Sequence, residues 1–218
     1  MLNDLQEKYF DEVRAMLPLH RICLFALGFI ATLVSQQQTH KSIVESLLRL
    51  NLKNFSFEPG NFLENAQILH VLLGITLIFL GWAVSKIITS FFFKFLLRKT
   101  RGVEKIHIEN KKIKLLLASS RKAAIEQLPY FEKQSIIASQ KVIRAANLGE
   151  LFMGIFICFM SAIWFGNALD LTVALIFLMF SLISIYLAIY LFFSKYVKFD
   201  LLRSAIAGTP SELNLPSE

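Results

Sequence analysis

The chain has 218 residues, of which 55% are hydrophobic and 18% are charged, and it contains 21 Phe. This composition is too apolar and too aromatic for an ordinary water-soluble domain, and it indicates a membrane protein. The length allows several spans of about 20 residues and one modest extramembrane region, so it excludes a separate large enzyme domain.

The N-terminal part of the chain predicts a cytoplasmic segment, residues 1–16, followed by a first span. The strictly apolar run from Ile22 to Val34 has 13 residues, fewer than the roughly 20 that cross a bilayer as a helix. A crossing helix therefore needs flanking residues, and we place it at 17–38. A short interfacial or re-entrant helix is the alternative for this segment.

Residues 39–67 form the expected periplasmic loop. The sequence Ser42-Ile43-Val44-Glu45 is a capping box, which predicts a short amphipathic helix through Leu52 on the outer membrane surface. The second span is expected at 68–97, as one helix with a cytoplasmic extension, because the long Lys86 and Lys94 side chains can reach the interface. His70, near its periplasmic start, is an interfacial anchor or a pH-sensing group in a wet cavity.

The segment 98–149 is predicted to be a basic, helical, cytoplasmic region. Its apolar periodicity predicts one helix from about Lys111 to Leu128 and another from about Phe131 to Ala146. Pro129 separates the two, because proline cannot continue a helix.

The charge of the middle of the chain has two explanations. Between Lys86 and Glu150 there are 14 Lys or Arg and five Glu. The positive-inside rule and anionic lipid explain the cations next to the membrane. The alternative, for cations further along the chain, is contact with an acidic cytosolic partner, either a protein or a nucleoprotein. The partner-contact candidates are Lys111, Lys112, Lys114, Arg121 and Lys122.

Two further spans follow, at 150–169 and 171–194. The chain carries no charge for 19 residues from Leu151 to Leu169 and for 24 residues from Leu171 to Ser194. The turn-forming cluster from Gly166 to Asp170 predicts a tight antiparallel hairpin. Asp170 is expected at its tip, in the interface or in water. Residues 195–218 are then a cytoplasmic tail.

Orientation follows from the distribution of Lys and Arg. The middle segment has 14 of them, whereas the loop from Ser35 to Gln67 has three and the hairpin tip has none. The middle segment is therefore cytoplasmic, and with four spans both termini are cytoplasmic as well. We thus expect an all-α integral protein of the bacterial inner membrane, with four transmembrane helices and a basic helical cytoplasmic segment between the second and the third.

Small residues lie on one face of the third span. Gly154, Cys158 and Ala162 are spaced four residues apart, which permits close contact between helices. These three helix-packing candidates serve either contacts within the bundle or contacts between copies in a homo-oligomer.

The sequence contains no pattern typical of catalysis. The four His are scattered, and no nucleophile elbow or phosphate-binding glycine loop occurs. We expect no catalytic residues, metal site, cofactor or small-molecule substrate, so the lipid bilayer and protein contacts remain as partners.

The plan of the chain, with short spans, the hairpin from Gly166 to Asp170 and the basic insert from Arg98 to Arg144, resembles the small multi-pass membrane subunits of bacterial antiphage systems. The resemblance implies a non-enzymatic sensor or effector of antiviral defence by abortive infection. A cytosolic partner or an infection signal would trigger it to perturb the inner membrane. Two alternatives stay open. Four spans with both ends inside are also similar to immunity proteins against pore-forming colicins, and a small subunit of a transporter or secretion machine has the same plan.

Overall fold

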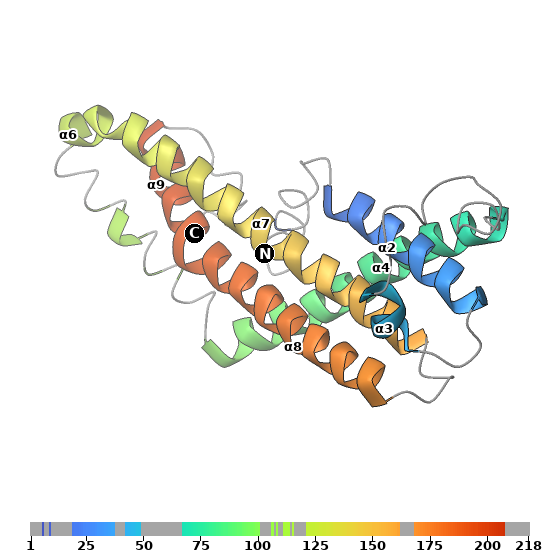
Figure 1. The fold of residues 1–218 in the computed structure, drawn as a ribbon. Coiled ribbons are helices and arrows are strands. Elements are labelled where there is room, and N and C mark those ends of the chain that lie inside the picture. Colours follow the sequence, from blue (N-terminus) through green and yellow to red (C-terminus); the bar gives the residue numbers. More distant parts are fainter. Residues whose placement is uncertain are drawn as a thin grey trace. The chain divides into compact units, whose positions relative to one another are not determined.

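The computed structural model describes residues 6, 9, 19–37, 42–48, 67–100, 106, 108, 111–113, 115, 121–161 and 168–207. Every regular element in this part of the chain is helical (Figure 1), which confirms the prediction of an all-α protein. The elements are α2 (Leu19–Gln37), α3 (Ile43–Leu48), α4 (Ile68–Thr100), α6 (Arg121–Glu126), α7 (Leu128–Ser161), α8 (Ala168–Leu191), the π-helix η3 (Phe192–Tyr196) and α9 (Val197–Ala207).

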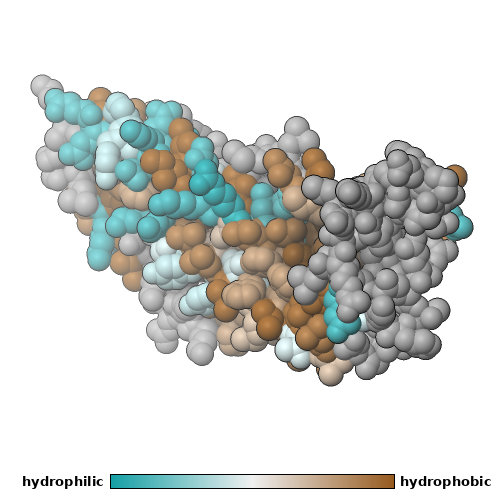
Figure 2. Space-filling model, in the orientation of Figure 1, coloured by the Kyte–Doolittle hydropathy of each residue, from teal (hydrophilic) through white to brown (hydrophobic). Residues whose placement is uncertain are grey.

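Three of the described helical stretches are long and apolar enough to cross a membrane, namely Ile68–Leu97, Leu128–Met160 and Ala168–Ala207. The most apolar window is only 22% buried in the first and 28% buried in the third. Phe79 and Phe180, for example, are 64% and 50% exposed. Such a surface is unfavourable in water and favourable in hydrocarbon, so it is typical of a membrane protein. Figure 2 shows apolar side chains over much of the described surface.

The predicted first span is not confirmed. Helix α2 has 19 residues, and its apolar part, Leu19–Thr32, is shorter than the helices that can cross a membrane. Arg21 near its start and polar residues at its end limit the apolar length, as the sequence indicated.

Helix α7 joins two segments that the sequence predicts as separate helices. Helix α6 ends at Glu126 and a turn at Gln127 precedes α7, which carries Pro129 in its first turn. Proline is tolerated there because the first turn needs no backbone donor. Beyond Pro129 the helix continues without a break through Gly149 to Ser161. The predicted cytoplasmic helix and the third span are therefore one helix.

The chain beyond α8 is also helical. The π-helix η3 follows α8 directly and leads into α9, so the helical run continues to Ala207. The predicted tail at 195–218 thus begins with a helix, and its last eleven residues lie outside the described part. In η3, Phe192 and Tyr196 are both buried.

The chain forms two compact units. The first consists of Met1–Leu17, Ile87–Ala146 and Ser184–Glu218. Its core is aromatic: the Tyr9 ring packs edge-on against Phe192 at 5.4 Å between ring centroids and lies 5.9 Å from Phe93. Gln6 Nε2 donates a hydrogen bond of 2.6 Å to Ser90 Oγ. These contacts hold described N-terminal residues against α4 and η3, and burial raises the pKa of the Tyr9 phenol above its usual range.

The second unit consists of Pro18–Lys86 and Asn147–Ile183, and glycines bring its helices together. A Cβ added to Gly28 on α2 would lie 3.3 Å from the Cα of Gly74 on α4. A Cβ added to Gly81 on α4 would lie 3.1 Å from the Cα of Gly154 on α7. Glycine at these positions allows the backbones to approach closely. Helix α4 therefore contacts α2 at one glycine pair and α7 at another.

Candidate functional site: a buried charge cluster of α2 and α7

The predicted partner-contact residues are only partly described by the structure. Lys111 and Lys112 have exposed side chains. Arg121 and Lys122 belong to the backbone of α6, but their side chains, like Lys114 as a whole, lie outside the described part. The described contacts do not bring these five residues together into one surface.

Two of the three predicted helix-packing residues, Gly154 and Cys158, lie on α7 and face the inside of the second unit. A Cβ at Gly154 would lie 2.4 Å from Leu24 Cδ2 of α2. Cys158 is buried in a cluster that includes Ala31, Leu77 and Ala174. The contacts of Gly154 and Cys158 are thus within one chain, and Ala162 lies outside the described residues.

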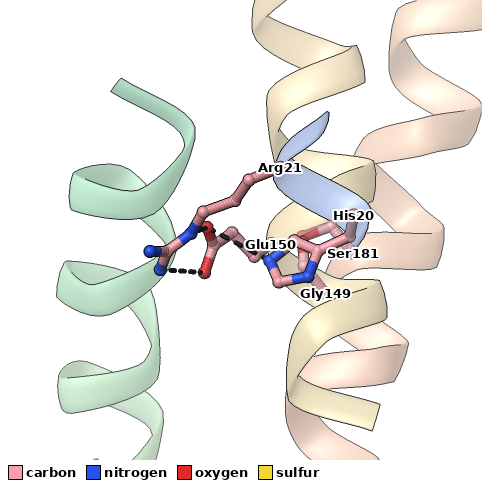
Figure 3. A network of polar contacts seen from close by, with 5 residues as sticks. All are labelled: His20, Arg21, Gly149, Glu150 and Ser181. Atoms are coloured by element: carbon pink, nitrogen blue, oxygen red, sulfur yellow. Dashed lines mark hydrogen bonds and ion pairs between the residues drawn. The ribbon is translucent and has the colours of Figure 1, made fainter. Parts of the chain in front are cut away.

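A carboxylate is buried one turn before Gly154. Glu150 receives two hydrogen bonds from Arg21 of α2, one of 2.7 Å from Nε to Oε1 and one of 3.3 Å from Nη2 to Oε2 (Figure 3). The side chain of Glu150 is 8% exposed and that of Arg21 is 37% exposed. This fork-to-fork pairing is the strongest geometry for an Arg–carboxylate pair.

His20 adds a third group to the cluster. Its Nε2 lies 3.3 Å from Glu150 Oε1, and its side chain is 8% exposed. The contact lacks hydrogen-bond geometry, so this buried nitrogen has no hydrogen-bond partner in the described part of the chain.

Local sequence explains why these groups meet. His20 and Arg21 lie in the first turn of α2, one turn before Leu24, and Leu24 fills the notch at Gly154. Glu150 lies four residues before Gly154 and therefore on the same side of α7. Because Leu24 packs closely on Gly154, Arg21 and Glu150, each about one turn earlier in its own helix, are brought next to each other.

A hydrogen bond between Ser181 of α8 and Gly149 of α7 gives the position of the cluster along α8. The Oγ of Ser181, which is fully buried, donates a bond of 2.9 Å to the carbonyl oxygen of Gly149, the neighbour of Glu150. Ser181 comes eleven residues after Asp170, which corresponds to about 16 Å of helix. The cluster therefore lies beside the apolar part of α8 and not at the end that carries Asp170.

This cluster is not predicted from the sequence. The predicted first span, 17–38, contains Arg21, and the predicted third span, 150–169, begins at Glu150, but neither segment by itself indicates that the two residues meet. A usable signal was present: both residues precede apolar runs that were expected to enter the membrane from the same side, and their charges are opposite. Pairing them requires knowing that these two helices are neighbours.

Asp170 differs from its predicted place in the interface or in water. It is 2% exposed, and its carboxylate accepts hydrogen bonds from Ser42 Oγ at 2.6 Å and from the backbone N–H groups of Ile43 and Val44 at 3.1 and 3.2 Å. It thereby caps the beginning of α3, whose amides need acceptors. Ile43 is buried in the core of this unit, so α3 packs against the protein here rather than lying on the membrane surface alone.

His70 is also buried, at 2% exposure, rather than exposed at an interface. Its Nδ1 accepts a hydrogen bond of 3.0 Å from the backbone N–H of Gln67, and its ring packs edge-on against Phe29. This histidine therefore closes the first turn of its own helix.

Within the described ranges, no three His, Cys, Asp or Glu side chains are grouped so that they could hold a metal ion. Comparison of the chain with protein-family models, with curated proteins and with solved structures gives no match.

Proposed function

We propose that this chain is a multi-pass protein of the bacterial inner membrane that acts through helix association and a cytosolic partner, without catalysis. It serves as a sensor or effector of antiphage defence, and it perturbs the membrane when triggered. The observation that carries this proposal is the cluster of Arg21, Glu150 and His20. Ionisable groups at membrane depth are costly, and where they occur they generally mark the functional part of a membrane protein.

The cluster suits a switch because the Arg21–Glu150 pair is either made or broken. When the Arg21–Glu150 pair is made, it holds α2 against α7; when it is broken, two charges in an apolar bundle require water. Entry of water into a helix bundle is what a membrane-perturbing effector needs. The resting protein keeps the pair closed, and the trigger opens it.

Four crossings with both termini in the cytoplasm are part of this proposal. The positive-inside rule assigns the basic segment between α4 and α7 to the cytoplasm. Gln6 and Tyr9 contact Ser90 and Phe93 in the half of α4 that leads into this segment, which supports an N-terminus on the same side. Helices α4, α7 and α8 supply three crossings, and α2 with the residues before it makes the fourth.

The test is expression in bacteria, with and without the neighbouring genes, while a voltage-sensitive dye reports membrane potential before and after phage infection. We expect wild-type protein to depolarise the membrane only after infection or together with a neighbouring gene. Arg21→Gln should depolarise without a trigger, because Glu150 loses its partner. The charge swap Arg21→Glu/Glu150→Arg is the control and should restore dependence on the trigger. A constant potential in every strain, with normal amounts of protein in the membrane, would refute the effector function.

The basic residues proposed for partner contact are tested in the same assay. Replacing Lys111, Lys112, Lys114, Arg121 and Lys122 together by Gln should abolish the triggered depolarisation and leave membrane insertion intact. An unchanged response would exclude these residues as the contact.

A second function, immunity against a pore-forming toxin, fits the same long, exposed apolar helices. Four spans with both ends inside are similar to immunity proteins against pore-forming colicins. Such a protein is harmless when overproduced and protects cells against one toxin. Protection without any depolarisation would support this function in place of the effector.

A further inference from the structure

The outer part of α7 has an exposed face that combines cations with apolar side chains. Tyr130 and Ile136 are 56% and 54% exposed, and Lys133, Lys141 and Arg144 are exposed as well. At 100° per residue, these five residues lie on one side of the helix, within about 140°. We name this face the α7 stripe. Figure 2 shows hydrophilic residues beside apolar ones in the region where α7 begins.

The opposite side of the same helix is buried. Ala138, Val142 and Ala145 belong to the core of the first unit and are at most 6% exposed. The core therefore determines how α7 is rotated, and the stripe faces outward because the apolar core positions face inward.

The three cations of the stripe have no intramolecular counter-charge in the described part of the chain. No ion pair found among the described residues involves Lys133, Lys141 or Arg144. Glu132, at the edge of the stripe, is the one carboxylate on α7 between Leu128 and Asn147. The stripe thus keeps a net positive charge next to an aromatic and an aliphatic side chain.

The direction of α7 indicates whether lipid or another protein covers the α7 stripe. The helix runs on from the stripe into an apolar stretch without a break. From Arg144 to Tyr130 it rises by about 21 Å. A helix that continues as a span cannot lie flat on the bilayer, so lipid headgroups reach only the inner end of the stripe. Its outer end, with Tyr130 and Lys133, requires a different occupant.

We propose that the α7 stripe is the docking surface for an acidic amphipathic helix of a cytosolic protein. Carboxylates of that helix pair with Lys133, Lys141 and Arg144, and its apolar side chains cover Tyr130 and Ile136. Tyr and Arg are enriched at the energetically important positions of protein interfaces. The inference rests on the proposed function, because it takes the basic side of the chain as the cytosolic side. It names a surface that the lysines around 111–122 do not include.

The first experiment uses full-length protein in nanodiscs of neutral phosphatidylcholine and a fluorescent helical peptide with Glu and Leu on one face. Binding is measured by anisotropy. We expect binding that weakens as salt increases and that is about tenfold weaker in Lys133→Gln/Lys141→Gln, since each lost exposed ion pair removes up to about 1 kcal/mol. The matched control, Lys195→Gln/Lys198→Gln, removes the same charge from exposed positions of η3 and α9. An equal loss in the control would show attraction by net charge alone and overturn the proposal.

Two further measurements test the apolar part and the lipid alternative. Tyr130→Ser/Ile136→Ser keeps the charge and should also weaken peptide binding; unchanged binding would overturn the mixed surface. A fluorophore on Lys133→Cys, in a variant with Cys23→Ser, should not be quenched by a quencher attached to lipid headgroups, even when phosphatidylglycerol is present. Strong quenching would identify anionic lipid as the occupant instead.

The cellular assay separates this inference from the proposed function. Loss of triggered depolarisation in Lys133→Gln/Lys141→Gln, with a normal response in Lys195→Gln/Lys198→Gln, supports docking at the stripe. A normal response in both would reject the stripe and leave the effector function standing. If the wild type binds the peptide through the stripe but never depolarises the membrane, the effector function fails and the docking surface stands.

Discussion

At the scale of single residues, Glu150 is a buried carboxylate whose negative charge needs a partner inside the helix packing. It is buried on α7, and the Arg21 guanidinium balances its charge with two hydrogen bonds. Pairing two buried charges contributes little net stability relative to an apolar pair, but removing one partner leaves the other uncompensated. The pair therefore specifies which helices are neighbours more than it adds to stability.

We expect Glu150→Gln to lower the free energy of unfolding by about 2–3 kcal/mol, somewhat less than for a fully buried pair, because Arg21 keeps 37% of its exposure. The double variant Arg21→Gln/Glu150→Gln should recover part of the loss. Unfolding in mixed detergent, followed by tryptophan fluorescence, provides the measurement. Lys198→Gln, at an exposed position, is the control and should be neutral. Equal stability of Glu150→Gln and wild type would contradict a buried pair.

Gly154 provides the second residue-scale prediction. Its missing Cβ leaves space that Leu24 occupies, at 2.4 Å from the position a methyl group would take. Gly154→Ala should therefore cost about 1–3 kcal/mol through overpacking. Leu24→Ala/Gly154→Ala should cost less than the sum of the two single changes, because each removes the other's clash or cavity. Strict additivity in the same unfolding assay would show that the two residues do not touch.

At the scale of elements, the long helices differ from α3 in what stabilises them. Helices α4, α7 and α8 have long apolar sequences that a bilayer favours as helices whatever their neighbours. Helix α3 has six residues, too few to be stable alone. Its amides depend on the carboxylate of Asp170, which belongs to the beginning of α8.

Asp170→Ala should therefore release the beginning of α3. We expect hydrogen exchange at the amides of Ile43 and Val44 to become faster, with a loss of about 1 kcal/mol as for other removed helix caps. Thr172→Ala is the matched control, because its exposed hydroxyl bonds only within the same turn of α8. If exchange were as slow in Asp170→Ala as in the control, another group would have to cap α3.

At the scale of the whole molecule, the number of crossings determines the side on which the N-terminus lies. With four crossings, alkaline phosphatase fused to either end stays in the cytoplasm and is inactive, whereas the same enzyme inserted within 51–60 is active. With three crossings, the N-terminal fusion becomes active. We expect the four-crossing result, because Gln6 and Tyr9 belong to the same unit as the basic segment. An active N-terminal fusion would make α2 a helix that enters the membrane without crossing it.

Hydropathy and length alone determine the class of this protein and three of its long apolar helices. These properties belong to single segments, because a helix in hydrocarbon satisfies its own backbone hydrogen bonds. The interruption at Gln127, just before Pro129, is similarly local, because proline favours the first turn of a helix. The continuity of α7 through Gly149 is less evident from the sequence, because a glycine in a helix interior costs about 1 kcal/mol of helix propensity and the burial of this position depends on the neighbouring helices.

Only the tertiary structure decided the pairings. Arg21 and Glu150 are 129 residues apart in the sequence, and Ser42 and Asp170 are 128 apart. A charge near the end of an apolar run has the same local sequence whether it faces water, lipid headgroups or an opposite charge. Which of these it meets depends on which helices touch, and here close contacts at Gly28, Gly81 and Gly154 determine that. The sequence by itself therefore determined which segments are apolar helices, and the packing of those helices decided which charges became buried partners.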